Sequence, residues 1–165
     1  MGNDLWETPK PFFDGVEDYF GDMDIDLAAN FQNRKVNKYF DEKDNSLKMD
    51  WNSYNMGWLN PPYSKPSIWL DKVNDEILKS KDLEVFMLLP MTFESNYYHN
   101  SVFNKPELVN TIYLINGRLS YLDENKKKVG SPRFGSCLIH FKRDFNREII
   151  SFGKCDREFK SVKLI

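Results

Sequence analysis

The amino-acid sequence predicts an α/β protein with a mostly parallel sheet and an antiparallel hairpin toward its C-terminal end. Segments with a helical period alternate with short apolar runs, prolines and glycines stand between them, and a polar turn separates the last two runs. Strands that alternate with helices usually lie parallel, because each helix returns the chain to the starting edge. The 165 residues are enough to bury a core, so we expect a single compact domain over residues 1–165.

Apolar residues recur at helical spacing in two segments. Over residues 12–20, four apolar side chains share one face and the acidic side chains point elsewhere. The second segment begins near Pro66, a residue favoured in the first turn of a helix, and it places Trp69, Val73 and Ile77 on an inner face. We therefore expect two amphipathic helices.

Strands are expected where apolar runs end at turn-forming residues. Residues 56–59 are a short run that stops at Pro61 and Pro62, because proline can neither donate to a ladder nor extend it. The further expected elements are strands over residues 23–29, 36–40, 84–89 and 109–115, a helical segment over 94–103, and a hairpin of residues 118–122 and 136–142.

The composition is that of a globular chain. Hydrophobic residues make up 41% of it and aromatic residues 15%, which excludes a disordered chain, and no apolar run approaches the ~20 residues that span a bilayer. No basic-plus-apolar leader opens the sequence, so we expect a cytoplasmic protein without membrane contact. Two cysteines and two histidines form neither a disulfide framework nor a usual zinc pattern, and we expect no metal.

Charge is unevenly distributed along the chain. Residues 1–125 hold 12 basic and 21 acidic side chains, a net −9, whereas residues 126–165 hold 11 basic and 4 acidic ones, a net +7. A basic segment of this kind can follow a phosphate backbone by releasing counterions. A solvated lysine-rich turn and tail fits the charge equally well.

The most informative motif is Asn60-Pro61-Pro62-Tyr63, which follows the expected strand over residues 56–59. In open α/β sheets, ligands bind in the crevice outside the carboxyl ends of the strands. Asn60 offers a side-chain carbonyl, and the two prolines hold the backbone rigid, so that a neighbouring carbonyl can be aimed at the same point. Tyr63 adds an aromatic face on which a base can stack. A tight turn with a surface tyrosine is the structural alternative.

Two such acceptors suit one reaction in particular. The exocyclic amine of a nucleobase is a poor nucleophile, because its lone pair is delocalised into the ring. Hydrogen bonds from its two protons to preorganised acceptors favour the pyramidal amine and stabilise the positive charge that develops during attack. The motif therefore indicates nucleophilic attack by an amine without a general base.

The tetrapeptide resembles the catalytic motif of amino methyltransferases that use S-adenosylmethionine (SAM). Over residues 4–143, further segments stand in the order seen in compact phage-type DNA N-6-adenine methyltransferases, the Dam family of phages and prophages. These segments are Trp6-Glu7-Thr8-Pro9, Asp26-Leu27-Ala28-Ala29, Leu47 with Asp50-Trp51, Leu88-Leu89-Pro90, Gly117-Arg118 and Ser131-Pro132-Arg133-Phe134-Gly135-Ser136.

The resemblance implies a Rossmann-like SAM-dependent methyltransferase without a separate target-recognition domain. Its activity would be direct methyl transfer to the N6 amine of an adenine flipped out of double-stranded DNA, in a bacterial host cytoplasm where the gene belongs to a phage or prophage. The tetrapeptide Asn60, Pro61, Pro62 and Tyr63 would be catalytic. No covalent enzyme intermediate is required, and neither Cys137 nor Cys155 stands in a motif that marks a nucleophile.

The resemblance also implies a cofactor site. The SAM pocket would be formed by Trp6, Thr8, Pro9, Asp26, Ala28 and Asn60, with Asp44 or Asp50 at the ribose or adenine edge. A carboxylate such as Asp26 can bind an ammonium group, and the small Ala28 lets a ligand approach the backbone. Asp26 as a loop cap and Trp6 as core packing are the alternatives, and the Gly-x-Gly loop of larger SAM enzymes is absent.

Several side chains are candidates for DNA contact. Phosphate contacts are expected from Lys65, Arg118, Lys126, Lys127, Lys128 and Arg133. Tyr97, Tyr98 and His99 either line a nucleic-acid groove or pack on the sheet, and Trp58 and Trp69 fit an apolar core better than a base-binding site.

Other substrates present the same amine chemistry. Cytosine N4, an RNA base and a glutamine amide each offer an NH₂ group to this tetrapeptide. A non-catalytic nucleic-acid-binding module that keeps the pocket as a relic is the alternative from another class, although such a module would not need the pair Asn60 and Tyr63.

Overall fold

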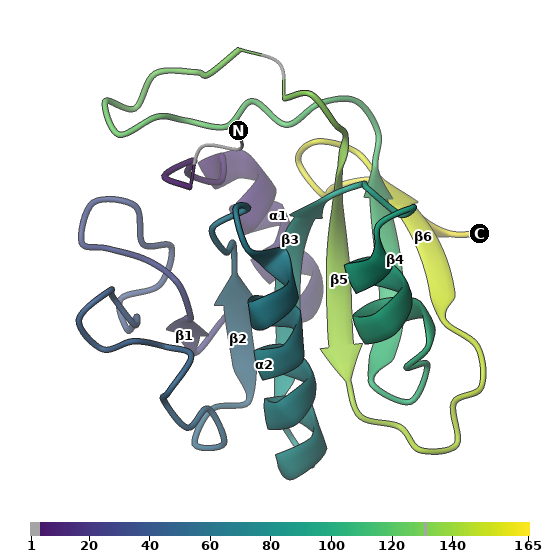
Figure 1. Ribbon diagram of the computed structural model, residues 1–165. Helices are drawn as coiled ribbons and strands as arrows, with labels where there is room; N and C mark the ends of the chain where they lie inside the picture. The colour runs from purple at the N-terminus through teal and green to yellow at the C-terminus, as the bar shows by residue number, and fades with distance from the viewer. Residues whose placement is uncertain (1–3, 131) are drawn as a thin grey trace.

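The computed structural model describes residues 4–130 and 132–165 and places helices on both faces of a central sheet (Figure 1). The helices are α1 (Lys10–Phe20), α2 (Pro66–Lys79), α3 (Asn96–Tyr98) and the π-helix η1 (His99–Phe103). The strands are β1 (Ile25–Asp26), β2 (Met56–Leu59), β3 (Glu84–Pro90), β4 (Val109–Ile115), β5 (Ser136–Lys142), β6 (Ser151–Cys155) and β7 (Val162–Leu164). The α/β class and the two long helices are confirmed.

The sheet is mixed, with the strand order β1-β2-β3-β5-β4-β6-β7. Parallel pairs join β1 to β2, β2 to β3 and β4 to β6, whereas β5 runs antiparallel to both β3 and β4, and β7 antiparallel to β6. The prediction of a mostly parallel sheet therefore needs correction. Residues 136–142 were expected to be antiparallel, but in a hairpin at the end of the sheet, whereas β5 lies between β3 and β4. A strand buried on both faces is a continuous apolar run wherever it is inserted, so its sequence does not reveal its neighbours.

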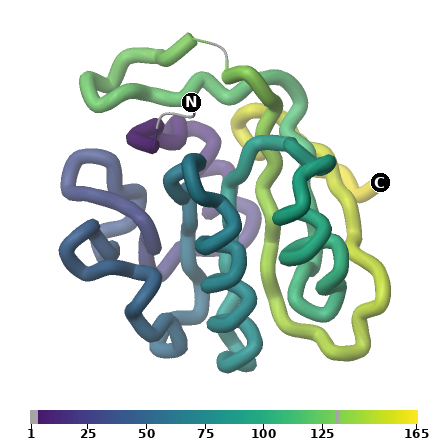
Figure 2. Tube along the Cα trace, in the orientation of Figure 1, coloured from purple at the N-terminus to yellow at the C-terminus, as the bar shows by residue number. Residues whose placement is uncertain are grey.

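The expected hairpin of residues 118–122 with residues 136–142 does not form. Both edges of β5 are occupied, by β3 and β4, so no edge is left for residues 118–122. Leu122 instead forms isolated bridges to Glu7 and Lys128. The chain between β4 and β5 thereby extends over the edge of the sheet at which β2 ends, beside the start of α1 (Figures 1 and 2).

The remaining differences concern short or edge elements. Only residues 25–26 of the expected strand over 23–29 are paired in the sheet. Residues 36–40 form no strand and contribute a single bridge, from Tyr39 to Asp26. The expected helical segment over residues 94–103 is helical from residue 96 on, as α3 and η1. The strands β6 and β7 were not predicted. Ser131, the first residue of a segment that carried the resemblance, lies outside the described residues.

Two apolar clusters hold the layers together, one on each face of the sheet. Alternate side chains of β3 enter different clusters: Val85 and Met87 pack with α2, whereas Phe86 and Leu88 pack with α1. This alternation buries β3 on both faces and fixes its register against β2. The ends of β1 and β2 are thereby held at one edge of the sheet. No helix in the described ranges is long and apolar enough to cross a membrane.

Candidate functional site

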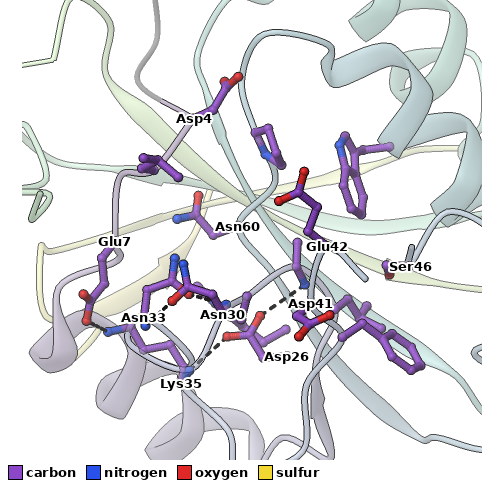
Figure 3. A pocket seen from close by; sticks show the side chains of 18 of the residues that line it. Asp4, Glu7, Asp26, Asn30, Asn33, Lys35, Asp41, Glu42, Ser46 and Asn60 are labelled. Atoms are coloured by element: carbon purple, nitrogen blue, oxygen red, sulfur yellow. Dashed lines mark hydrogen bonds and ion pairs between the residues drawn. The ribbon is translucent and has the colours of Figure 1, made fainter. Parts of the chain in front are cut away.

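A pocket of about 410 Å³ lies at the edge where β1 and β2 end (Figure 3). Its walls come from the N-terminal segment, from the chain between β1 and β2, and from the turn that begins at Asn60. Parallel strands bring their carboxyl ends to the same edge, and Asp26 closes β1 while Asn60 follows β2. The two residues that the sequence placed at strand ends therefore face the same cavity.

The Asn60 amide is held at both of its ends. Its Nδ2 donates to the Trp6 carbonyl oxygen at 2.9 Å, and its Oδ1 accepts from the Tyr63 hydroxyl at 2.9 Å. The bond to Trp6 fixes which amide atom is nitrogen, so the side-chain carbonyl has one defined direction. The turn thus presents a preorganised acceptor beside the pocket.

Tyr63 takes part through its hydroxyl as well as its ring. The hydroxyl oxygen lies 3.1 Å from that of Tyr121, and the two rings meet edge to face at 6.4 Å. Tyr121 in turn stacks on Trp6, with ring centroids 5.5 Å apart, and its hydroxyl lies 2.9 Å from Ser136 Oγ. Burial raises the pKa of Tyr63 well above its ordinary value and that of Tyr121 to about 12, so both phenols stay protonated at neutral pH.

Asp26 is almost completely buried, with 3% of its surface exposed, and it lines the pocket. Its Oδ2 accepts from the Lys35 backbone N–H at 2.9 Å and its Oδ1 from the Ala28 N–H at 3.3 Å. Burial raises the pKa of this carboxyl to about 6 against the opposing effect of these two hydrogen bonds. Asp26 therefore organises the loop after β1 and also presents a carboxyl group to the cavity.

An ion cluster of two buried side chains, Glu7 and Lys35, and the exposed Lys126 closes one wall. Glu7 pairs with Lys35, whose Nζ lies 2.7 Å from Oε1, and through its other oxygen with Lys126. Lys126 Nζ also donates to the Gln32 carbonyl oxygen at 2.6 Å. This lysine of the loop between β4 and β5 is therefore tied to the pocket wall.

The pocket has a negative field and unmet hydrogen-bonding capacity. Among the described residues, the acidic side chains that line it are Asp4, Glu7, Asp26, Asp41 and Glu42, and the basic one is Lys35. Thr8 Oγ1 and Ser46 Oγ, from two residues of the wall, are buried without a hydrogen-bond partner in the described structure. Such a site suits a ligand that carries positive charge and polar groups.

Most of the predicted cofactor residues meet here. Those that line the pocket are Trp6, Thr8, Asp26, Ala28 and Asn60, together with Pro62 of the tetrapeptide. Pro61 is buried and does not line it, and Pro9 lines a neighbouring groove at the start of α1. Asp44 and Asp50 are exposed and lie outside the described lining. Asp44 accepts from the Asp41 N–H, which leaves Asp41 and Glu42 as the acidic residues at this side of the cavity.

Aromatic residues divide between core and pocket. Trp58 and Trp69 are buried, as expected of core residues, but each also contributes to the pocket wall. Tyr98 is fully buried, stacks on Phe103 and donates to the Pro90 carbonyl, whereas His99 is exposed.

The basic residues do not form one surface. Lys65 follows the tetrapeptide and is exposed, as are Lys127, Lys128 and Arg133 on the loop between β4 and β5. Arg118 donates to the Pro132 carbonyl. Lys142, by contrast, pairs with Glu84 at the opposite edge of the sheet. The net +7 of the C-terminal segment is thus divided between both edges.

Several residues of this site were not assigned by sequence reasoning, among them Glu7, Lys35, Tyr121 and Ser136. Glu7 and Ser136 stand inside segments that carried the family resemblance, so the signal was present but had no chemical role attached to it. Lys35 and Tyr121 stand outside those segments. They reach the site only through the folding of the loops.

Comparisons with known proteins agree on one family. The family described as "DNA N-6-adenine-methyltransferase (Dam)" matches residues 1–163. The chain is 29% identical over 148 residues to a DNA N-6-adenine-methyltransferase of Escherichia phage T1, which covers 82% of this chain and 61% of that protein. It is 33% identical over 122 residues to the DNA N-6-adenine-methyltransferase of Haemophilus phage HP1 (strain HP1c1), covering 73% of this chain and 67% of that protein.

A shorter match is a putative methyltransferase, YfdM, of Escherichia coli (strain K12), which is 34% identical over 65 residues, 36% of this chain and 71% of that protein. The chain spans less than two thirds of the length of the phage T1 relative.

Proposed function

This chain belongs to the DNA N-6-adenine-methyltransferase (Dam) family, and from that membership we propose that it transfers a methyl group from SAM to the N6 amine of adenine in DNA. The observation that carries the proposal is the position of Asn60. Its amide carbonyl is held in one direction by hydrogen bonds on both sides, at the strand end that borders the acidic pocket. Residues 1–165 would form one domain that holds both substrates.

The pocket fits SAM by charge and by size. SAM carries a sulfonium and an ammonium group, and the described part of the lining holds five acidic side chains and one lysine. About 410 Å³ is within the usual range for a site of this kind. Asp26 would face the ammonium or a ribose hydroxyl, and the unpartnered hydroxyls of Thr8 and Ser46 would take up further polar groups. The cofactor supplies an electrophilic methyl group.

The tetrapeptide would act on the amine. Asn60 Oδ1 and a backbone carbonyl of the proline turn would accept the two N6 protons, which favours the pyramidal amine and stabilises the developing positive charge. No residue needs to remove a proton before attack. The Tyr63 ring would support the base, a contact worth about 1–3 kcal/mol in single-stranded nucleic acids.

The target adenine would reach this turn only after leaving the base stack. Flipping costs a few kcal/mol and exposes the N6 amine that the duplex hides. Phosphate contacts would come from exposed basic residues. Lys65 follows the tetrapeptide in the sequence, and the loop between β4 and β5 carries Lys127, Lys128 and Arg133. Such contacts hold the duplex in place without reading its sequence.

The test is methyl transfer from tritiated SAM to unmethylated DNA, RNA and protein, followed by nucleoside analysis. We expect label in DNA, as N6-methyladenine. Label in N4-methylcytosine, in RNA or in glutamine would show that the methyl acceptor is not adenine in DNA, while SAM would remain the methyl donor. SAM binding without any transfer would identify a binding module instead.

A further inference from the structure

A chain of buried hydroxyl groups leads from the sheet to the tetrapeptide. Ser136 Oγ lies 2.9 Å from the Tyr121 hydroxyl, which lies 3.1 Å from the Tyr63 hydroxyl, which donates to Asn60 Oδ1 at 2.9 Å. Ser136 and Tyr121 are 2% and 1% exposed. These groups come from β5, from the loop between β4 and β5, and from the turn after β2.

The direction of this chain follows from its last member. Asn60 Nδ2 is committed to the Trp6 carbonyl, so Oδ1 is the amide atom that faces Tyr63, and a carbonyl oxygen can only accept. Tyr63 must therefore donate to Asn60. Because a hydroxyl has one proton, Tyr63 then accepts from Tyr121, and Tyr121 accepts from Ser136.

This direction makes the Tyr63 hydroxyl compete with the amine for Asn60. The N6 amine has to donate to the same oxygen that already accepts from Tyr63. An amide oxygen has two lone pairs and can accept from both groups, but the second donor weakens the bond that should strengthen as charge develops on the amine. Methyl transfer therefore gains if the Tyr63 proton has another acceptor when adenine arrives.

We propose that Tyr121 is a positioning residue that supplies this acceptor, so that the hydroxyl chain reverses when the target adenine occupies the site. This inference rests on the proposed function. In the reversed chain Tyr63 donates to Tyr121, Tyr121 donates to Ser136, and Asn60 Oδ1 is left to the amine. Hydroxyl rotation alone achieves this, because each of the three oxygens can accept as well as donate. The raised pKa values of both phenols keep their protons in place.

Reversal predicts a specific pattern among phenylalanine variants. In Tyr121→Phe the Tyr63 hydroxyl has no alternative acceptor and keeps its hydrogen bond to Asn60. Methyl transfer should then slow about tenfold, which corresponds to the free energy of one ordinary hydrogen bond. Tyr63→Phe removes the competing donor and should keep most of the parent's rate. The double variant should transfer as fast as Tyr63→Phe alone, so the second substitution rescues the first.

The measurement is single-turnover transfer to duplex DNA, with SAM affinity and thermal unfolding recorded for every variant. Tyr98→Phe is the matched control, because it removes a buried tyrosine hydroxyl that donates to the Pro90 carbonyl instead. It should alter unfolding without slowing transfer. Ser136→Ala is a second test that removes only the end of the chain, and it should slow transfer by a smaller factor than Tyr121→Phe does.

Two results would overturn the inference: an unchanged rate in Tyr121→Phe, or a double variant as slow as Tyr121→Phe. The first would show that Tyr63 needs no other acceptor. The second would show that the Tyr121 hydroxyl acts independently of Tyr63, through its contact with Ser136, because phenylalanine keeps the ring that packs on Trp6. Both presuppose that the parent methylates adenine. A parent without that activity would contradict the proposed function itself, which makes the two failures distinguishable.

Discussion

Glu7 and Lys126 form an ion pair that joins the pocket wall to the loop between β4 and β5. The pair joins residues far apart in the sequence, and it divides three consecutive lysines into two kinds. All three are exposed, but the Lys126 ammonium is held by Glu7 and by the Gln32 carbonyl, whereas no ion pair is seen for Lys127 or Lys128 among the described residues. The charge distribution along the chain does not distinguish these lysines from one another.

The lysines of this loop should therefore differ in their effect on DNA binding. Substituting Lys127 and Lys128 together by alanine should weaken binding to all DNA sequences alike. It should also reduce the slope of log affinity against log salt by roughly one unit for each phosphate that the variant no longer neutralises. Lys126→Ala should leave that slope nearly unchanged and lower SAM affinity, because it releases the wall at Glu7.

The measurements are salt titrations of DNA affinity and calorimetry with SAM. Lys81→Ala, an exposed lysine just after α2, is the control for removal of one positive charge. Equal slopes for the parent and the Lys127/Lys128 double variant would show that these lysines form a solvated turn, and the DNA surface would have to be sought elsewhere.

Asn60→Ala should lower the rate of methyl transfer far more than it weakens SAM binding. Loss of one preorganised partner of the developing charge typically costs on the order of 3 kcal/mol, about a hundredfold in rate. Single-turnover kinetics on duplex DNA measure it, with thermal unfolding as a check because Asn60 also bonds to Trp6 and Tyr63. Asn146→Ala, an exposed asparagine between β5 and β6, should behave like the parent. A rate within about threefold of the parent would remove Asn60 from the mechanism.

The sequence predicted those elements whose bounds depend on local signals. Residues 56–59 are recognisable because two prolines follow them, and residues 109–115 because the run is apolar and ends in a polar turn. The position of β5 between β3 and β4 depends on long-range pairing, which a doubly buried run does not encode. The strand β6 contains Gly153 and polar residues, and β7 has only three residues, so neither offers a clear alternation.

In the candidate site, too, some residues were predictable from local signals and others were not. The tetrapeptide and Asp26 stand at strand ends and were predictable from that position. The rest of the wall is a loop held by side chains that bond to nearby backbone, as where Asn30 Oδ1 accepts from the Asn33 N–H and Asp26 from that of Lys35. Such bonds follow no helical or strand period, so the meeting of Glu7 with Lys35 had no signal.

The SAM affinity of the protein should depend on the ionisation of Asp26. Burial raises the pKa of this carboxyl from 3.8 to about 6 in the folded protein. Below that pH the group is neutral and cannot pair with an ammonium, so affinity should fall as pH is lowered through about 6. Calorimetry across this range should show the decrease in the parent and a weak, nearly flat dependence in Asp26→Asn.

The same shift also affects folding. Between pH 3.8 and about 6 the folded state keeps a proton that the unfolded chain has released, so Asp26 lowers the free energy of unfolding as pH rises through this window. Asp26→Asn should remove that dependence. Glu42→Gln, at an exposed carboxyl of the same pocket, is the matched control and should keep the parent's pH dependence of unfolding.

The affinity prediction has its own contrary outcome. If SAM affinity in Asp26→Asn changed with pH as it does in the parent, a group other than Asp26 would cause the pH dependence.

Glu84 should make the protein sensitive to acid in the opposite sense. Its Oε2 lies 2.6 Å from His140 Nε2 and its Oε1 2.6 Å from Lys142 Nζ. The hydrogen bond with His140 has the largest effect on the pKa of Glu84, and the one from Lys142 acts in the same direction. Together they lower this pKa from 4.5 to about 2, against the effect of burial. The stabilisation is therefore complete above pH 4.5 and is lost as pH falls toward about 2.

In thermal unfolding across that range, Glu84→Gln should lie below the parent near neutral pH and approach it in acid. Glu148→Gln, at an exposed glutamate between β5 and β6, should follow the parent throughout. SAM affinity should be unchanged in both variants, because Glu84 begins β3 at the edge opposite the pocket. The contrary outcome is a difference in unfolding temperature between Glu84→Gln and the parent that is the same at every pH. It would mean that the Glu84 side chain stabilises the protein by packing, because a contribution from its negative charge would disappear once the carboxylate is protonated.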